Sequence, residues 1–258
     1  MASDQATAVS CEAGGYVFVL GSDFASQGVA ALPGMTIQRA ELAAPADLEE
    51  GFSQVRRHLE RLGRPLAALC GLELRMPEVL SGQDFLDFNR TRYLAKLQSW
   101  GLLRQDGSPL ARTNVAPRFR GPPTISVSAF SFTAESAAPG PAFVLSGLAE
   151  LPEDRRYPRA IIRRGESDAA ALMEKTAWIV GALQARMRAL GLVWDDAAAV
   201  RLYSTHAIAF ALQREVLAGA GIAPANGVTW LDAAPPVPEL ALEIDVRCCS
   251  QEYRLAAA

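Results

Sequence analysis

Hydrophobic and polar positions change period several times along the first half of the chain, and each change predicts an element. The apolar run 16–21 follows two glycines and predicts a buried strand, and 36–42 predicts a second strand or a turn. From Asp47 to Gly63, apolar residues recur at helical spacing behind an acidic first turn, which predicts an amphipathic helix. The run 66–76 is apolar enough for a central strand, and 81–101 begins like a capping box and predicts a second helix.

Arg112 stands ahead of the last strand predicted for this half. Pro122-Pro123 separate it from residues 124–130, where apolar side chains alternate with Ser126 and Ser128, the period of a half-buried strand. A guanidinium held at the mouth of that strand could fork onto a substrate carboxylate. The alternative, a surface arginine that solvates a strand end, remains open.

The second half repeats this order of elements. The helix predicted over 168–190 ends in Leu190-Gly191, 128 residues after Leu62-Gly63. The other repeated elements are a strand at 143–147, a strand at 197–205, a helix at 207–217 and a last strand at 240–246 behind Pro235-Pro236. Each half therefore has the order ββαβαβ.

A loop rich in alanine, serine, proline and glycine at 134–141 marks the boundary between the halves. We predict two tandem units, 1–135 and 141–258. Strands that alternate with helices in this order predict an α+β fold, in which helices cover one face of a mixed sheet.

Composition narrows the class of function. The 258 residues are 50% hydrophobic with a formal net charge of −3, and basic and acidic residues are interspersed, so neither nucleic acid nor a membrane is an expected partner. The first residues lack the pattern of a signal peptide, and no apolar run approaches the roughly 18–20 residues of a membrane span, so we expect a cytoplasmic protein. A small-molecule ligand is the better expectation.

The cysteines and histidines do not predict a metal site. Four cysteines lack CxxC spacing and only two histidines accompany them, so neither structural zinc nor a disulfide framework is expected. Cys248-Cys249 end an apolar strand, where packing is the first expectation and redox chemistry the alternative. We expect no cofactor.

Four short motifs, together with the repeated order of elements, resemble the RidA/YjgF family of enamine and imine deaminases. They are ARTNV at 111–115, FNRTRY at 88–93, FVLSG at 143–147 and LEIDV at 242–246. The resemblance covers both halves. It implies the chorismate-mutase-like fold of that family in each unit and hydrolysis without a cofactor.

The resemblance assigns roles to individual residues. Arg112 matches the arginine that pairs with the substrate carboxylate, Asn89 matches the asparagine of the second helix, and Glu243 matches the glutamate that positions the hydrolytic water. The match is divided between the halves. The first half has Ser126 where the glutamate is expected, and the second has Val228 in place of the arginine.

Asn114 and Trp230 occupy the position of the family's cysteine, two residues after the arginine position, and Ser146 belongs to the SG motif. Neither half is a complete copy. Because RidA sites lie between neighbouring units of a trimer, the resemblance implies one site shared by the halves and a homo-oligomer, with a trimer favoured. Asn114, Ser146 and Trp230 are then expected to contact the substrate.

Arg118 and Arg120 place two further cations on alternate positions downstream of Arg112. They would suit a second carboxylate, and the alternative is a solvated edge strand. A dicarboxylate substrate is therefore expected. Long two-unit chains of this family resemble the 2-aminomuconate and 2-amino-5-chloromuconate deaminases of nitroaromatic degradation, which implies hydrolysis of an enamine or imine dicarboxylate to the 2-oxo acid and ammonia.

Two other functions remain open. A chorismatase-like hydrolase would also resemble tandem RidA units and act on an enol-linked carboxylate through water and a glutamate. A non-catalytic RidA-like protein would bind small acids for regulation, because both half-sites lack one of the two main groups.

Overall fold

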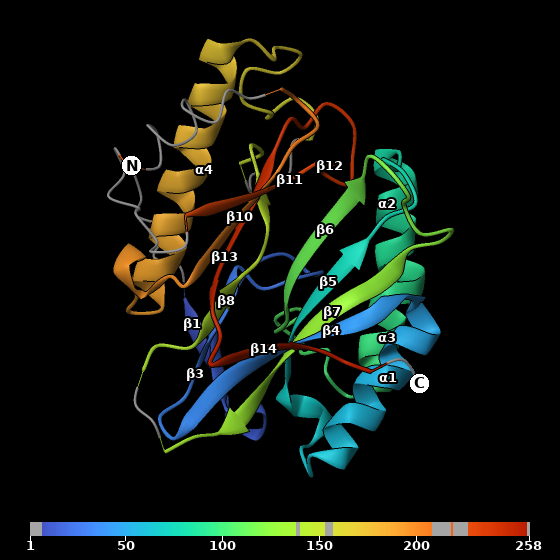
Figure 1. Ribbon diagram of the computed structural model, residues 1–258, viewed down its shortest axis with the longest axis vertical. Coiled ribbons are helices and arrows are strands. Elements are labelled where there is room, and N and C mark those ends of the chain that lie inside the picture. Colours follow the sequence, from blue (N-terminus) through green and yellow to red (C-terminus); the bar gives the residue numbers. More distant parts are fainter. Residues whose placement is uncertain (1–6, 138–139, 153–156, 208–217, 219–226, 257–258) are drawn as a thin grey trace.

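Two β-sheets stacked face to face form the centre of the molecule, and helices cover their outer faces (Figure 1). The computed structural model describes residues 7–137, 140–152, 157–207, 218 and 227–256. Within these residues, α4 (Ala169–Ala189) packs on one sheet, and α1 (Leu48–Arg61), α2 (Gly82–Phe88) and α3 (Leu94–Ser99) pack on the other.

The described strands form one sheet of eight strands and one of six. The eight-stranded sheet runs in the order β1 (Ala8–Cys11), β2 (Tyr16–Val19), β3 (Gly28–Ala31), β8 (Phe143–Leu145), β13 (Glu243–Cys248), β10 (Ala199–Tyr203) and β11 (Val228–Leu231), with β9 (Leu148–Ala149) also paired to β13. The six-stranded sheet runs in the order β12 (Ala233–Ala234), β6 (Ala111–Pro117), β5 (Leu69–Arg75), β7 (Ser126–Glu135), β4 (Met35–Asp47) and β14 (Gln251–Arg254).

The predicted helices α1 and α4 are confirmed, together with their ends. The Asp47 side chain accepts a hydrogen bond from the Glu50 amide at the start of α1, and Asp168 caps α4 in the same way. Gly63, with a φ of 65°, follows α1 in the left-handed conformation that glycine adopts without strain. The apolar faces of both helices are buried against their sheets, as the helical spacing predicted.

The helix predicted over 81–101 is interrupted. Ser81 caps α2 as expected, but Asn89–Tyr93 form a π-helical turn before the chain continues as α3. The Asn89 amide nitrogen donates to the Phe85 carbonyl within this turn. Such turns are frequent at functional sites, because the extra residue per turn redirects side chains.

The two sheets share one pattern of strand pairing. In the set β4–β7–β5–β6 the first two pairs are antiparallel and the last is parallel, and the set β8–β13–β10–β11 repeats this pattern. The registers also correspond. Arg112 pairs with Leu72, and Val228 pairs with Val200, which lies 128 residues after Leu72.

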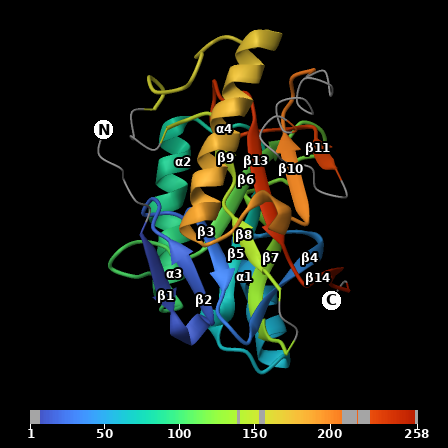
Figure 2. The same ribbon diagram turned by 90° about the vertical axis from the view of Figure 1, so that its left-hand side faces the viewer.

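Several strands cross the predicted boundary at 134–141. β1, β2 and β3 of the first half extend the sheet that contains β8, and Figure 2 shows them beside the strands beneath α4. In the other direction, β12 and β14 of the second half pair with β6 and β4. The sheets therefore contain strands from both halves.

Two expectations about the stretch around Arg112 were wrong. Residues 126–133 of β7 are buried on both faces rather than one, because the second sheet is stacked on the face opposite the helices. Within its own sheet, the Ser128 hydroxyl donates to the Glu73 carbonyl of the neighbouring strand β5. Arg112 lies within β6 and not at the mouth of β7, since residues 111–117 form a strand of their own that pairs in parallel with β5.

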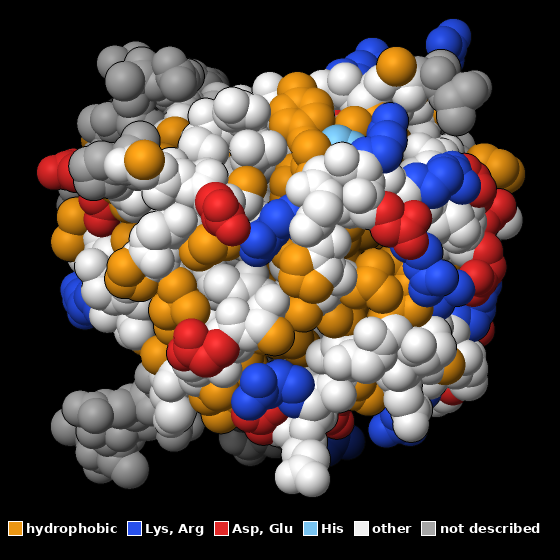
Figure 3. All heavy atoms as spheres, turned by 90° about the horizontal axis from the view of Figure 1, so that it is seen from below, with side chains coloured by type: hydrophobic (Ala, Val, Ile, Leu, Met, Phe, Trp, Pro, Cys, Tyr) orange, Lys and Arg blue, Asp and Glu red, His pale blue; other side chains and the backbone are white. Residues whose placement is uncertain are grey.

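The start of the predicted strand 66–76 also differs, because Leu66–Ala68 form a 3-10 turn before β5. Residues 208–217 of the helix predicted at 207–217 lie outside the described part of the chain. None of the helices in the described part is both long and apolar enough to cross a membrane. On the face in Figure 3, basic and acidic side chains are interspersed around apolar ones.

Candidate active site

A cavity of about 340 Å³ lies where the two sheets meet, and both halves of the chain line it. β6 contributes Arg112 and Asn114 from the first half. The second half contributes Ser146 and Gly147 after β8, and Glu243 at the start of β13. Pockets of roughly 300–1,000 Å³ bind small molecules, so this one suits a small metabolite.

Arg112 is buried and is oriented by the π-helical turn. Its Nη1 donates to Asn89 Oδ1 at 2.7 Å, and its guanidinium carbon lies 4.4 Å from the centre of the Tyr93 ring. Burial lowers the pKa of Arg112, because removal from water disfavours the charged form. Its Nε is buried with no hydrogen-bond partner among the described residues, which leaves one donor of this cavity-lining arginine unsatisfied.

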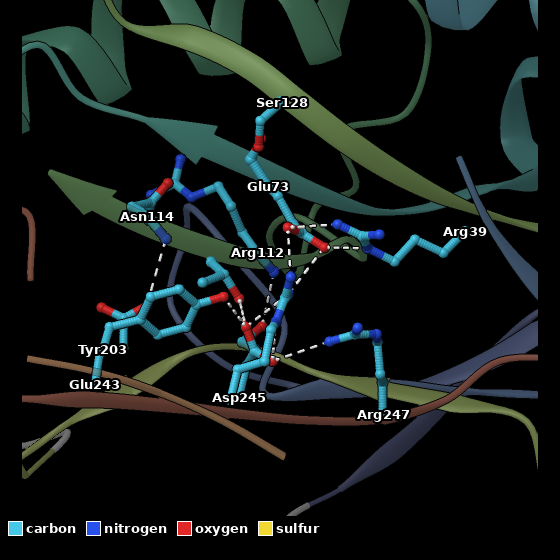
Figure 4. A network of polar contacts seen from close by, with 12 residues as sticks. Arg39, Glu73, Arg112, Asn114, Ser128, Tyr203, Glu243, Asp245 and Arg247 are labelled. Atoms are coloured by element: carbon cyan, nitrogen blue, oxygen red, sulfur yellow. Dashed lines mark hydrogen bonds and ion pairs between the residues drawn. The ribbon is translucent and has the colours of Figure 1, made fainter. Parts of the chain in front are cut away.

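Glu243 lies beside Arg112 across the junction of the sheets. Its Oε1 accepts a hydrogen bond from the Asn114 backbone amide at 3.4 Å, and its carboxylate points toward Asn114 in Figure 4. Burial, and secondarily the nearby Asp245 carboxylate, raise the pKa of Glu243 to about 8. At pH 7 most molecules therefore hold Glu243 protonated, as a proton donor.

Gly147 forms the wall behind Glu243. A Cβ atom at this position would overlap Glu243 Oε1, so the carboxyl group occupies space that only glycine leaves open. The Gly147 amide donates to the Arg112 carbonyl at 3.1 Å, which joins the two halves at the cavity.

Ser146 and Asn114 complete the polar lining. The Ser146 hydroxyl accepts from the Arg112 amide at 2.9 Å and donates to the Ser26 carbonyl at 2.6 Å. Ser146 thus positions the backbone of Arg112. The side-chain Oδ1 of Asn114 is buried with no partner among the described residues, and it offers an acceptor to a ligand N–H.

A buried ionic network lies next to the cavity and joins the two sheets (Figure 4). Arg201 of β10 contacts Glu73 of β5 at 2.9 Å and Asp245 of β13 at 2.8 Å. Arg39 also contacts Glu73 at 2.6 Å, and Tyr203 donates to Asp245 at 2.7 Å. Burial alone would raise the pKa of Glu73, but Arg201 and Arg39 hold it well below its usual range.

The structure therefore brings together five of the residues predicted from sequence, Asn89, Arg112, Asn114, Ser146 and Glu243. It places the other three outside the lining of this cavity. Arg118 is exposed and donates to the Thr205 carbonyl, Arg120 is an exposed turn residue, and Trp230 is 45% exposed and donates to the Ser204 carbonyl.

Comparison with known proteins gives one decisive match. The family described as 2-aminomuconate deaminase CnbZ matches residues 8–253. The chain belongs to the CnbZ family.

A curated relative of this CnbZ chain is a 2-amino-5-chloromuconate deaminase from Comamonas testosteroni. The two are 36% identical over 248 residues, which cover 95% of this chain and 98% of the relative. Among solved structures, a chorismatase aligns with 94% of this chain, and the alignment includes 79% of the chorismatase chain. The two chains are 11% identical, and the TM-score is 0.48.

A charged residue that lines the cavity of this CnbZ family member has no distinguishing signal in the sequence. Arg186 of α4 lines the cavity, and its Nη1 donates to the Ser146 carbonyl at 3.3 Å. In sequence it is one of several polar positions on an amphipathic helix, and no local pattern distinguishes it from Arg188. Within the described residues, no group of three or more histidine, cysteine, aspartate or glutamate side chains could hold a metal ion.

Proposed function

We propose that this chain is a cofactor-independent hydrolase that deaminates 2-aminomuconate or its 5-chloro analogue to the 2-oxo acid and ammonia. Membership of the CnbZ family and the curated relative support the substrate class. The observation that carries the mechanism is the pairing, in one cavity, of a buried arginine with a carboxyl group that is protonated at neutral pH.

Arg112 anchors the carboxylate beside C2 of the substrate. Its Nε lacks a partner, and Asn89 and Tyr93 fix the plane of the guanidinium, so little side-chain freedom is lost on binding. With that carboxylate held, C2 and its amino group lie toward Glu243 and Asn114. Asn114 Oδ1 accepts a hydrogen bond from the amino group.

Glu243 acts first as an acid and then as a base. The enamine takes a proton from Glu243 on a diene carbon, and the nitrogen lone pair forms the C2=N bond of an iminium ion. Water adds its oxygen to C2 and gives a proton to the Glu243 carboxylate. Glu243 then protonates the amino nitrogen, the C2–N bond breaks, ammonia leaves, and the hydroxyl proton returns to Glu243 as C2=O forms.

This sequence consumes one water, releases one ammonia and needs no redox step. It also extends the role that the RidA resemblance gives to Glu243. A glutamate that only positions water would need to be ionised. With a pKa of about 8, the Glu243 carboxyl group is instead protonated at neutral pH and can donate the proton that starts the reaction.

We further propose that the chain is a tandem of two RidA-like units, 1–135 and 141–258, with one composite site. The repeated pairing pattern and the registers of Arg112 and Val228 support this proposal. The resemblance also favours a homo-oligomer, with a trimer as the proposed state, and mass photometry at working concentration tests it.

The direct test is ammonia release from freshly generated 2-aminomuconate. We expect Arg112→Ala to lower kcat/KM roughly 100-fold through lost orientation, and Glu243→Gln to lower kcat by roughly 100-fold or more through lost proton transfer. Arg92→Ala and Glu60→Gln, at exposed helical positions, are the matched controls.

Each alternative predicts a different result. A wild-type protein that releases no ammonia above the spontaneous rate contradicts the deaminase. Turnover of a chorismate-type substrate without ammonia would then support the chorismatase-like hydrolase, and binding of small acids without turnover would support a regulatory protein.

A further inference from the structure

A buried ion pair joins α4 to the segment that pairs with the start of β13. Lys175 of α4 is 1% exposed, and Glu150, which follows β9, is fully buried. The Lys175 Nζ donates to Glu150 Oε1 at 2.9 Å. Lys175 shares the buried face of α4 with Leu172 and Ile179, three residues before it and four after it, so the pair lies within the packing of the helix on its sheet.

The Glu150 carboxylate also accepts two consecutive backbone amides. The Ala241 amide donates to Oε1 at 2.6 Å, and the Leu242 amide donates to Oε2 at 3.3 Å. These two residues directly precede Glu243, where β13 begins. Both oxygens of one side chain therefore hold the backbone that leads into the proposed acid.

The same stretch of backbone is held from two further sides. The Ser204 hydroxyl donates to the Ala241 carbonyl at 2.8 Å. Ala149, which lines the cavity, pairs with Glu243 in the ladder between β9 and β13. Glu150 is the next residue after Ala149, so its side chain continues the attachment of β13 where the strand pairing ends.

Stability alone does not explain charges at this place. Removal of two charges from water is costly, and apolar residues of similar volume often give equal or greater stability. An apolar pair, however, could not accept the amides of Ala241 and Leu242. A carboxylate fixed by a cation offers both of its oxygens in defined positions, which suits the pair to holding backbone.

The Glu243 carboxyl group has little room for displacement. Its Oε1 accepts from the Asn114 amide at 3.4 Å and occupies the space that Gly147 leaves open. A shift of the two residues before Glu243 would move the carboxyl group relative to both neighbours. Misplacement of a reacting group by about 1 Å can lower a rate on the order of 100-fold.

We propose that Glu150 and Lys175 are positioning residues, which fix the backbone before Glu243 and thereby the place of its carboxyl group in the cavity. This inference rests on the proposed acid role of Glu243. Neither residue is assigned a contact with the substrate, whose carboxylate Arg112 anchors. Their loss is therefore expected to lower kcat and to leave KM nearly unchanged.

Glu150→Gln tests the proposal, because glutamine retains the length of the side chain and one of the two acceptors. We expect kcat for 2-aminomuconate to fall about 10-fold and KM to change less than about twofold. A displaced Glu243 is less deeply buried, so its pKa should fall, and the alkaline limb of kcat/KM should move to lower pH by roughly 1 unit. The variant retains the nearby charges that act on Glu243, namely those of Asp245, Arg75 and Arg112.

Glu174→Gln is the matched control. Glu174 is the residue before Lys175, but its side chain is 57% exposed and pairs with Arg163 at the surface. We expect its kcat and its alkaline limb to equal those of wild type, because an exposed pair contributes little. Equal kcat and equal pH profiles in Glu150→Gln and Glu174→Gln would overturn the proposal.

The double variant Glu150→Gln/Lys175→Met separates position from stability. Glu150→Gln leaves the buried charge of Lys175 unpaired, and the second substitution removes that charge, so the double variant should unfold at a higher urea concentration than Glu150→Gln. One backbone amide still lacks its acceptor, so kcat should remain about 10-fold low. Recovery of full kcat together with stability would overturn the proposal, because a purely structural pair would behave in that way.

Titration of Glu243 without substrate separates this inference from the proposed reaction. In protein with isotope-labelled glutamate carboxyl groups, the NMR signal that Glu243→Gln lacks should titrate near pH 8 in wild type and at lower pH in the double variant. An unchanged midpoint in the folded double variant overturns the positioning role, even if wild type releases ammonia. A lowered midpoint, with no ammonia release by wild type, supports the positioning role and contradicts the proposed reaction instead.

Discussion

Glu243 carries the main pH dependence of the candidate site. Its pKa of about 8 lies above its ordinary value of 4.5, so folding favours the protonated form. In the proposed mechanism this form begins the reaction. We expect kcat/KM to fall above about pH 8, and a plateau that extends well beyond pH 9 would contradict an acid role for Glu243.

The same shift predicts a stability effect that a purely catalytic change would not produce. Because the folded pKa is raised, the contribution of Glu243 to the free energy of unfolding is fully present below pH 4.5 and is lost as the pH rises through about 8. Glu243→Gln should remove this decrease. At pH 8 we expect the kcat of the variant to be roughly 100-fold or more below that of wild type, and the variant to be about 4 kcal/mol more stable, measured by urea unfolding.

Gly147 sets the position of the Glu243 carboxyl group. In Gly147→Ala the added methyl group must displace Glu243 Oε1, and we expect a loss of about 100-fold in kcat from misplacement of the acid. Gly181→Ala in α4 is the control, because its Cβ meets no neighbouring atom, and it should stabilise the helix by roughly 0.5–1 kcal/mol with normal activity. Equal activity of the two variants would show that Glu243 tolerates movement.

At the scale of elements, the network of Arg39, Glu73, Arg201 and Asp245 fixes one sheet against the other. Arg201→Met leaves Glu73 and Asp245 with less compensation in a buried environment, and we expect a loss of about 3–5 kcal/mol in the free energy of unfolding. Arg57→Met is the control, because its pair with Glu50 is solvent-exposed and its loss should leave the free energy of unfolding nearly unchanged.

Acid unfolding should also distinguish Arg201→Met from the Arg57→Met control. Glu73 has a lowered folded pKa, so its contribution to stability is present above its ordinary pKa and is lost as the pH falls toward the folded value. Without Arg201 the pKa of Glu73 rises, and acid unfolding should begin at a higher pH in Arg201→Met than in wild type. An identical acid midpoint would mean that Arg39 and Arg75 stabilise the Glu73 carboxylate without Arg201.

At the scale of the whole molecule, sequence predicted local elements better than their partners. Helical spacing and acidic caps were sufficient to predict α1 and α4, and the motifs named five residues that the structure brings together at one cavity. The sequence did not predict which distant strands pair. The hydrophobic and polar pattern of β1–β3 would be the same whichever sheet they joined. The burial of both faces of β7 follows from the stacked second sheet, which no local pattern reports.

The site residues divide in the same way. Arg112, Asn89 and Glu243 lie in motifs, whereas Arg186 lies on a long helix, and its access to the cavity depends on how α4 packs on β8 and β9. Arg118 and Arg120 are the opposite case, because they do not line the cavity. Their spacing from Arg112 suggested proximity along the chain, but the residues after β6 leave the cavity.

The exchange of strands between the halves predicts that neither half folds alone. A fragment of residues 1–137 loses β14 from its sheet and leaves β3 without β8, and a fragment of residues 140–258 loses the β1–β3 extension. We expect neither fragment to melt cooperatively. Co-expressed, the two should associate and recover ammonia release, and independent cooperative melting of either would contradict this expectation.

The placement of Arg112 and Glu243 on a single polypeptide also controls stoichiometry. If the two units were separate proteins, each could associate with copies of itself. Such assemblies would contain either Arg112 without Glu243 or Glu243 without Arg112. A covalent link instead supplies each molecule with one of each, at an effective concentration of about millimolar or higher. In the proposed tandem of two units, Ser126 and Val228 are the counterparts of Glu243 and Arg112, and neither would need to take part in catalysis.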